Sequence, residues 1–255
     1  MTKIKYFKII HTFLCSIGFN LLKFKNILYL YKYLGDLYKY KKKGGKIDYL
    51  FPIISDHKQQ AGSFDKQYFY QDIIVAQEIF HKRPEKHVDI GSRLDGFVSN
   101  VASFREIEVF DIRPLNIDIK NIKFKKIDLM DMGENLQNYS DSVSCLHTIE
   151  HFGLGRYGDK IDPKAYLTGI YNLQKILKKD GYLYLSMPIS SNTKIYFNAE
   201  RVFNPFEILN INEKLEYVKF HFIDDEGKIF LNYDIQNLKN KVFNYSCGIF
   251  IFRKK

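Results

Sequence analysis

The chain has 255 residues and a mass of 30.2 kDa, enough for one sizeable α/β core with an extension but too little for two full domains. The net charge is +10, yet the first 50 residues carry eleven lysines and only two aspartates, so the remainder is close to neutral. This distribution removes the charge-based argument for a nucleic-acid partner, and we expect none.

The cysteines give no sign of a metal or disulfide site. Cys15, Cys145 and Cys247 are far apart in the sequence and match no metal-binding or redox spacing. No apolar run is long enough to span a bilayer, because Lys23 and Lys25 interrupt the longest candidate. We therefore expect a cytoplasmic protein without a bound metal, with the inner face of the membrane as the alternative location.

Residues 1–60 are predicted to form a basic, amphipathic helical extension. Apolar residues recur every three or four positions between Ile4 and Leu37, which places them on one helical stripe flanked by lysines. The charged and glycine-containing run at residues 41–45 ends this segment. Two uses of residues 1–46 stay open: packing on the body or on a second copy of the chain, and contact with an acidic lipid surface.

Residues 61–255 are predicted to form an α/β domain with a Rossmann-like, mostly parallel seven-stranded sheet flanked by helices. A helix is expected at 65–81, closed by Pro84. Short apolar runs then alternate with helical stretches, as in parallel sheets with crossover helices. The expected strands are 87–90, 108–112, 123–127, 142–147 and 182–187, with 217–223 and 245–252 as the sixth and seventh.

A glycine-containing turn follows the first strand. In the run Asp89-Ile90-Gly91-Ser92-Arg93 the strand passes into a turn and then a helix, which brings backbone amides close to a ligand. Asp111 ends the next strand, twenty residues after Gly91, where its carboxylate can accept the ribose hydroxyls of an adenosine. The scarcity of further glycines counts against a nicotinamide enzyme, whose pyrophosphate must approach the backbone.

The motif order resembles that of class I S-adenosylmethionine-dependent methyltransferases over about residues 65–188: Asp89-Ile90-Gly91-Ser92, then Asp111, Ile127-Asp128-Leu129, and Leu177-Lys178-Lys179-Asp180-Gly181. The resemblance implies S-adenosylmethionine as cofactor and S-adenosylhomocysteine as product. It implies a methionine end shaped by Asp89, Gly91 and Ser92, a ribose held by Asp111 beside Ile112, and an adenine flanked by Asp128 and Leu129. Arg93 has two open interpretations, a clamp on the methionine carboxylate and a surface salt bridge.

A longer match concerns the strings at 68–72, 88–96, 111–115 and 144–159. They are similar to an uncharacterised bacterial family of methyltransferase-like proteins associated with surface-polysaccharide gene sets. This resemblance implies O- or N-methyl transfer to a small molecule or a capsular-polysaccharide precursor, at a sugar, phosphate or phosphoramidate group. The alternative hypothesis is an inactive protein of the same fold that acts as a membrane-associated scaffold.

The methyl acceptor is expected beside the end of the fourth strand. His147 is the first candidate for a general base and His151 the second, with Glu150 between them in sequence; the alternative is that the histidines only pack. The glycine-rich loop at 153–159 is a natural lid. The predicted acceptor-binding residues are Arg156 and Tyr157 in this loop, and Asn198 and Arg201 after the fifth strand, with a structural role as the alternative for each.

Overall fold

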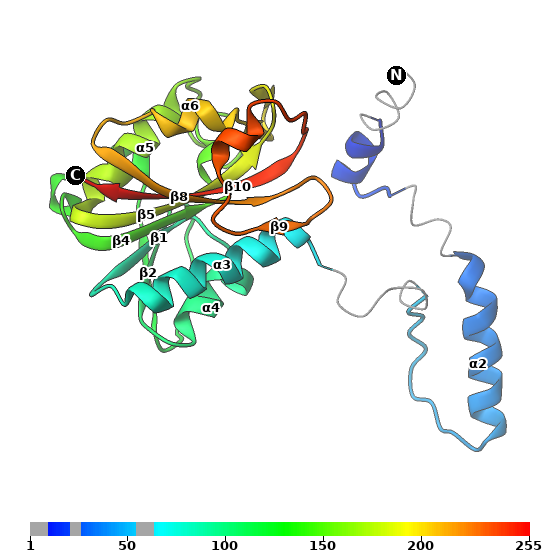
Figure 1. Cartoon of the computed structure of the whole chain (residues 1–255). Coiled ribbons are helices and arrows are strands. Elements are labelled where there is room, and N and C mark those ends of the chain that lie inside the picture. Colours follow the sequence, from blue (N-terminus) through cyan, green and yellow to red (C-terminus); the bar gives the residue numbers. More distant parts are fainter. Residues whose placement is uncertain (1–9, 21–26, 55–63) are drawn as a thin grey trace. The chain divides into compact units, whose positions relative to one another are not determined.

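The computed structural model describes residues 10–20, 27–54 and 64–255 (Figure 1). The chain divides into two compact units, residues 1–64 and 65–255. The predicted domain boundary between residues 60 and 61 lies outside the described residues. Within the described part of the chain, no helix combines the length and apolar character needed to cross a membrane.

The described part of the first unit contains helices separated by non-helical stretches. Residues 10–16 are helical, and α2 (Leu30–Lys42) carries Lys39, Lys41 and Lys42 in its last turn, where cations interact favourably with the helix dipole. The helix ends before Gly44, whose φ of +83° suits a glycine. None of the residues of α2 is buried. The predicted apolar stripe also runs through residues 4–9 and 21–26, which lie outside the described residues.

The second unit is built on one large sheet. In the part of the chain from residue 64 onward, its eight strands have the order β3-β2-β1-β4-β5-β10-β8-β9. The strands are β1 (His87–Ile90), β2 (Ile107–Asp111), β3 (Ile122–Lys126), β4 (Ser140–Leu146), β5 (Leu177–Ile189), β8 (Leu215–Ile223), β9 (Ile229–Phe230) and β10 (Ser246–Lys254). Neighbours among β1 to β5 pair in parallel, whereas β10 pairs antiparallel with both β5 and β8. The predicted Rossmann-like fold is confirmed.

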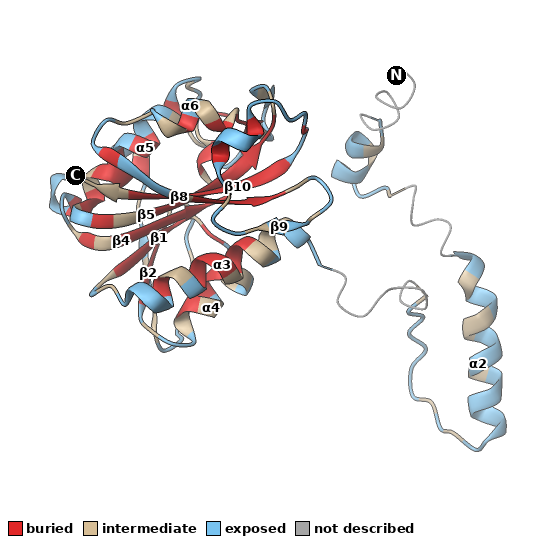
Figure 2. Cartoon of the chain, in the orientation of Figure 1, coloured by how far each residue is buried: buried red, intermediate tan, exposed pale blue. Residues whose placement is uncertain are grey.

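Helices cover both faces of this sheet. On one face, α3 (Lys66–Lys82) and α4 (Ser99–Ala102) pack against a cluster that includes Ile79 and Val109 (Figure 1). On the other, α5 (Ala165–Ile176) and α6 (Pro205–Leu209) pack against a larger apolar cluster. The central strands β1, β2, β4 and β10 are almost wholly buried, whereas the edge strands β3 and β9 are not (Figure 2). Short helical turns complete the unit: η3 (Leu94–Val98), η4 (Leu129–Asp131), η5 (Glu134–Leu136), η6 (Ile149–His151) and η7 (Ile235–Leu238).

Three details of the sheet differ from the sequence-based expectation. β5 begins at Leu177 rather than at residue 182, and the predicted seven strands are joined by the two-residue strand β9. A separate hairpin, β6 (Lys194–Tyr196) and β7 (Glu200–Val202), follows β5. The strands β6, β7 and β9 are two to three residues long, which is too short for an alternating pattern to be recognised in the sequence.

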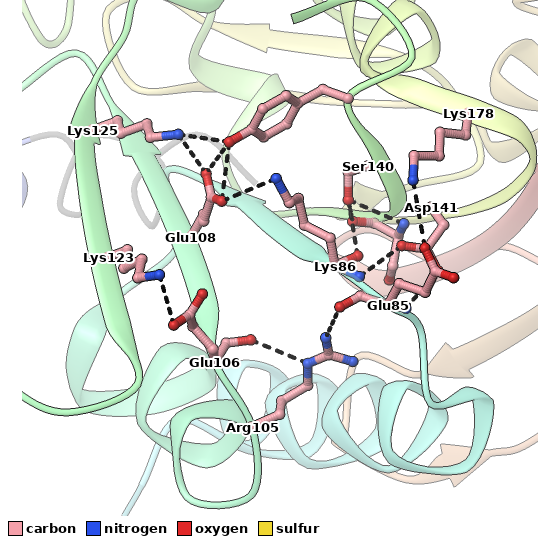
Figure 3. Close-up of polar contacts among 12 residues, drawn as sticks. Glu85, Lys86, Arg105, Glu106, Glu108, Lys123, Lys125, Ser140, Asp141 and Lys178 are labelled. Atoms are coloured by element: carbon pink, nitrogen blue, oxygen red, sulfur yellow. Dashed lines mark hydrogen bonds and ion pairs between the residues drawn. The ribbon is translucent and has the colours of Figure 1, made fainter.

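The amino ends of β1 to β4 are tied together by a charged network (Figure 3). The Glu108 carboxylate accepts hydrogen bonds from Lys125 Nζ and Tyr139 Oη, each at 2.7 Å, and lies 3.5 Å from Lys86 Nζ. Asp141 accepts the backbone N–H groups of residues 85 and 86. Each buried charge at this end has a partner of opposite sign or a hydrogen-bond donor, as a stable interior requires.

Candidate functional site

A cavity of about 360 Å³ opens at the carboxyl ends of β1, β2 and β4. The strand order reverses between β1 and β4, and ligands of open α/β sheets bind at such switch points. Five of the predicted cofactor residues line the cavity, namely Gly91, Asp111, Ile112, Asp128 and Leu129. From the predicted acceptor side, His147, His151 and Tyr157 line it as well. Sequence motifs that are up to 66 residues apart therefore meet at one place.

Asp89 holds the turn after β1 rather than facing the cavity. Its side chain is completely buried and accepts the backbone N–H of Ser92 at 3.0 Å and the Ser92 hydroxyl at 2.7 Å. Burial raises the pKa of Asp89 to about 6, against the opposing effect of hydrogen bonds from Ser144 and Ser92. Asp89 and Ser92, both predicted at the methionine end, thus hold the turn by hydrogen bonds and do not line the cavity.

Position 91 has no room for a side chain. Its φ is +72°, and a Cβ added there would lie 2.6 Å from Cγ2 of Thr148. The turn therefore passes close to the residue that follows His147. A larger residue at position 91 would push the cavity wall apart.

Arg93 lies outside the cavity. Its guanidinium pairs with Asp95 at 2.8 Å, and both side chains are more than 60% exposed, at 64% and 71%. The surface salt bridge, one of the two interpretations that the sequence allowed, is the one this structure shows. Such an exposed pair contributes little to stability.

Asp111 is engaged by a cation that the motif analysis missed. The carboxylate accepts the backbone N–H of Arg113 at 2.8 Å, its Nε at 3.0 Å and a terminal guanidinium nitrogen at 2.6 Å. The guanidinium also lies 4.6 Å from the centre of the Tyr157 ring. The spacing Asp-Ile-Arg was the signal available in the sequence. Both oxygens that could accept ribose hydroxyls are thus held by the chain's own arginine.

The predicted adenine end is a short helical turn, η4, with a side-chain cap. Asp128 caps η4 by accepting the backbone N–H of Met130 at 2.8 Å, and Leu129 is buried. Asn172 of α5 donates to the carbonyl of Leu129 at 2.8 Å. Because α5 fixes this backbone, the apolar Leu129 and the polar Asp128 keep fixed positions at the cavity wall.

Glu150 lies between the two candidate bases. One carboxylate oxygen is 3.3 Å from Nδ1 of His147 and 3.8 Å from Nε2 of His151. Among the described residues, neither oxygen of this fully buried carboxylate accepts a hydrogen bond. An ionised carboxylate is costly to bury without donors, and groups of this kind are concentrated at functional sites.

His147 is enclosed by protein on both sides of its ring. Nδ1 faces Glu150, Nε2 lies 3.5 Å from Sγ of Cys247 on β10, and the Tyr68 ring is 4.6 Å away. Burial works to lower the pKa of His147, but the contacts with Cys247 and Glu150 outweigh it and raise the pKa well above its ordinary value. The backbone has a φ of +47°, unusual for a histidine. His147 is therefore held as a cation beside Glu150.

His151 has one ring nitrogen fixed and one directed toward Glu150. Its Nδ1 lies 2.7 Å from the carbonyl oxygen of Ala199, which can only accept, so Nδ1 carries a proton. Arg156 donates to the same carbonyl at 3.1 Å. In the neutral ring the remaining lone pair is on Nε2, beside the carboxylate of Glu150.

The loop at 153–159 is built around one carboxylate. Asp159 accepts the backbone N–H groups of Gly153, Gly155 and Tyr157 at 2.8 to 3.2 Å. The Tyr157 ring lies against His151, with ring centres 5.7 Å apart. The loop therefore reaches from the histidines to Arg113 across the cavity.

Two of the predicted acceptor-binding residues have structural surroundings. Arg201 is buried, and its guanidinium donates to the carbonyls of Glu150, Phe152 and Pro163. Asn198 adopts a φ of +64° in the turn between β6 and β7 and donates to the Leu154 carbonyl at 3.4 Å. Arg201 thus holds the backbone on either side of the loop at 153–159, Asn198 contacts the loop itself, and neither side chain lines the cavity.

A sequence profile of the DUF268 family, described as a Caenorhabditis protein of unknown function, matches residues 101–255. The chain belongs to the DUF268 family. The DUF268 region contains Asp111, Asp128 and both histidines, whereas the Gly91 turn precedes it. Among proteins with curated descriptions, none matches the sequence.

Solved structures share the fold of this DUF268 chain. One is the N-methyltransferase NodS from Bradyrhizobium japonicum WM9 in complex with S-adenosylhomocysteine. The two chains are 13% identical, the alignment covers 75% of this chain and 89% of NodS, and the TM-score is 0.52. A proposed sarcosine dimethylglycine methyltransferase from Galdieria sulphuraria has 14% identity, covers 86% of this chain and 98% of its own, and scores 0.53. The [4+2]-cyclase SpnF is 11% identical, the alignment covers 75% of this chain and 85% of SpnF, and the TM-score is 0.52. At these identities the likeness establishes the fold alone.

Proposed function

We propose that this chain is an S-adenosylmethionine-dependent methyltransferase that acts on an oxygen or nitrogen of a small acceptor. The observation that carries the proposal is the cavity at the switch point, where Gly91, Asp111 and Asp128 meet. The fold neighbours support it in general terms, since NodS is an N-methyltransferase crystallised with S-adenosylhomocysteine. When bound, the cofactor supplies an electrophilic methyl group.

The residues present fit an adenosyl cofactor. A cavity of about 360 Å³ is within the range of small-molecule sites. Gly91 removes a Cβ that would otherwise collide with Thr148 at the cavity wall. Asp111 would hold the ribose, Leu129 and Ile112 would provide apolar walls for the base, and the Gly91 turn would receive the methionine end.

We propose His151 as the general base, in place of the first candidate from the sequence, His147. An acceptor O–H or N–H must lose its proton as the heteroatom bonds to the methyl carbon. Nε2 of neutral His151 has a lone pair for that proton, and Glu150 at 3.8 Å would stabilise the resulting imidazolium. His147, already held as a cation between Glu150 and Cys247, is less suited to accept a proton.

Arg156 and Tyr157 remain proposed acceptor contacts, because their loop borders the cavity beside His151. We propose a small molecule or surface-polysaccharide precursor as the acceptor; the sequence resemblance supports this class, as does the near-neutral charge beyond residue 50. A cytoplasmic location, and contact of residues 1–46 with a membrane or a second copy, are proposed on the basic amphipathic pattern. The inactive scaffold is less favoured, because it gives no role to His151, whose Nε2 faces Glu150 at the wall of the cavity.

Calorimetric titration with S-adenosylhomocysteine tests the proposal. The wild-type chain is expected to bind in the micromolar range, and Asp111→Ala to reduce affinity by about 100-fold, because two hydrogen bonds to a charged group are lost. Glu106→Gln, which removes an acid at the opposite end of the sheet, is the control and should leave affinity unchanged. Equal affinities for wild type and Asp111→Ala would overturn the site, and no binding by the wild type would overturn the function.

A further inference from the structure

A buried chain of hydrogen bonds joins β1 and β4 beneath the Gly91 turn. Ser142 Oγ lies 2.8 Å from Nδ1 of His87, whose Nε2 lies 3.1 Å from Oγ of Ser144. The Ser144 hydroxyl donates to Oδ1 of Asp89 at 2.5 Å. Each of these four side chains belongs to a residue that is at most 1% exposed. The parallel pairing places His87 opposite Ser142 and Asp89 opposite Ser144, so the contacts follow from strand register.

The direction of each hydrogen bond in this chain is fixed by chemistry. A carboxylate only accepts, so the single hydroxyl proton of Ser144 goes to Asp89. The oxygen of Ser144 must then accept from Nε2–H of His87. Burial, with a smaller effect of Arg105, lowers the pKa of His87 to about 3, so the ring is neutral and its Nδ1 accepts from Ser142. Ser142, His87 and Ser144 therefore form a relay that points toward Asp89.

Asp89 depends on this relay because it has no basic partner among the described contacts. Its hydrogen bonds come from Ser144 and Ser92. The charged or titratable groups around it are Asp72 on α3 and Cys145 on β4, with the neutral His87 on its own strand. Asp72 disfavours a second negative charge nearby, and Cys145 provides no compensating cation. The hydroxyl of Ser144 is thus a main stabiliser of the Asp89 carboxylate.

The carboxylate in turn fixes the cavity. Oδ2 of Asp89 accepts the N–H of Ser92, one residue after Gly91. The position of that turn decides how closely Gly91 approaches Thr148 and a bound ligand. A weakened Asp89 would let the turn relax, and the ligand would then have to supply the ordering free energy.

We propose that His87 is a positioning residue for the cofactor, acting through Ser144 on Asp89 and so on the Gly91–Ser92 turn. This inference rests on the proposed function. His87 itself does not line the cavity, and its effect is transmitted by two hydrogen bonds. The relay also makes cofactor affinity sensitive to acid, because a protonated Asp89 no longer accepts from both serines.

Titration of S-adenosylhomocysteine binding against pH, from 5 to 8, tests the relay. Burial raises the pKa of Asp89 to about 6, so wild-type affinity should be constant above that value and fall below it. Ser144→Ala should weaken binding at pH 7 by about tenfold, the loss of one charge-assisted hydrogen bond, and move the midpoint upward. His87→Leu should move the midpoint in the same direction by a smaller amount, and His87→Gln, whose amide can donate to Ser144, should restore it.

Two variants separate this effect from a general disturbance of β4 or of acidic groups. Ser140→Ala removes a buried hydroxyl from the same strand that bonds to the Lys86 carbonyl and to the backbone of Ser142, but to none of the relay side chains, so it should leave the midpoint unchanged. Burial raises the pKa of Asp72 also to about 6, so Asp72→Asn is needed. If affinity still falls at low pH in Asp72→Asn, the loss belongs to Asp89. If it no longer falls, the assignment to Asp89 is overturned.

Nitrogen NMR of the His87 ring provides a readout on the wild-type protein that needs no variant to fold. The relay requires a proton on Nε2, none on Nδ1, and no titration of the ring between pH 5 and 8. A proton on Nδ1 instead would overturn the inference. Binding with an unchanged midpoint in Ser144→Ala and His87→Leu would overturn it while leaving the proposed function intact. Absence of any wild-type binding would overturn both.

Discussion

The two ends of the sheet treat buried charge in opposite ways. At the amino ends, Glu108 is surrounded by Lys125, Lys86 and Tyr139, so its charge is compensated within the protein (Figure 3). At the carboxyl ends, Glu150 lies 3.3 Å from His147 without accepting a hydrogen bond from the described residues, and the donors to Asp89 among those residues are the Ser144 hydroxyl and the hydroxyl and N–H of Ser92. At the end of the sheet away from the cavity, the chain thus provides lysine partners for a buried acid. The acids beside the cavity are thus compensated by histidine, hydroxyl and backbone groups rather than by lysines, and buried titratable groups of this kind are concentrated at functional sites.

The largest effect is expected at the carboxyl end. His151→Ala should lower methyl transfer by about 100-fold or more, the contribution of a general base, while leaving the affinity for S-adenosylhomocysteine unchanged. Transfer of labelled methyl groups into a small-molecule cell extract, together with calorimetry, measures the two. His81→Ala, an exposed histidine on α3, is the matched control. A larger loss of transfer in His147→Asn than in His151→Ala would return the base role to His147.

Replacing Glu108 by Gln should have the largest effect on stability. Burial alone would raise the pKa of Glu108, but Lys125 and Tyr139 outweigh it and lower the pKa. The pair therefore stabilises the fold above the ordinary carboxyl pKa, and that stability is lost as pH falls. We expect Glu108→Gln to lower the free energy of unfolding at pH 7 by about 2 kcal/mol, as when hydrogen bonds to a charged group are lost. Denaturant unfolding measures it; unchanged stability would show that the network is incidental.

Replacing Glu150 by Gln should have a small effect on the free energy of unfolding at any one pH, but a clear effect on how that free energy changes with pH. The pKa of His147 is raised well above the ordinary value of 6.5, so its stabilising contribution is complete below that value and is lost as pH rises through the raised pKa. Glu150→Gln removes the carboxylate that favours the cation. The melting temperature should therefore fall less steeply above pH 6.5 in this variant than in the wild type. An unchanged profile would mean that Glu150 does not hold His147 charged.

The smallest effect is expected at Arg113. Because its guanidinium occupies both oxygens of Asp111, it competes with any ribose for the same acceptors. Arg113→Gln should therefore tighten S-adenosylhomocysteine binding by about threefold, since the ligand no longer has to displace a guanidinium whose side chain is half exposed. Calorimetry at two salt concentrations measures it. Weaker binding in the variant would show that Arg113 contacts the ligand rather than competing with it.

The sequence predicted the parts of the molecule that depend on local pattern. Strand runs that carry Asp89 and Asp111 near their carboxyl ends predicted a parallel sheet with acids at one edge, and the fold confirms the parallel pairing. Gly91 and Asp128 lie at this edge because both follow strands of the same sheet. Their roles toward a cofactor remain proposals.

The remaining features arise from contacts between distant segments. The pairing of His147 with Cys247 joins residues 100 apart, and Tyr68 reaches the same ring from α3. Arg201 was an attractive anion ligand in sequence, but folding buries it against three carbonyls. Neither motif spacing nor periodicity contains information on such contacts, because they are set by how β10 and the β6–β7 hairpin pack.

The most direct test of the account is a crystal structure of the chain with S-adenosylhomocysteine. We expect the nucleoside in the cavity at the ends of β1, β2 and β4, with both ribose hydroxyls on Asp111, the adenine against Leu129 and the sulfur directed toward His151. Density for the ligand elsewhere, or a cavity closed by Arg113 and Tyr157 at saturating ligand, would contradict it.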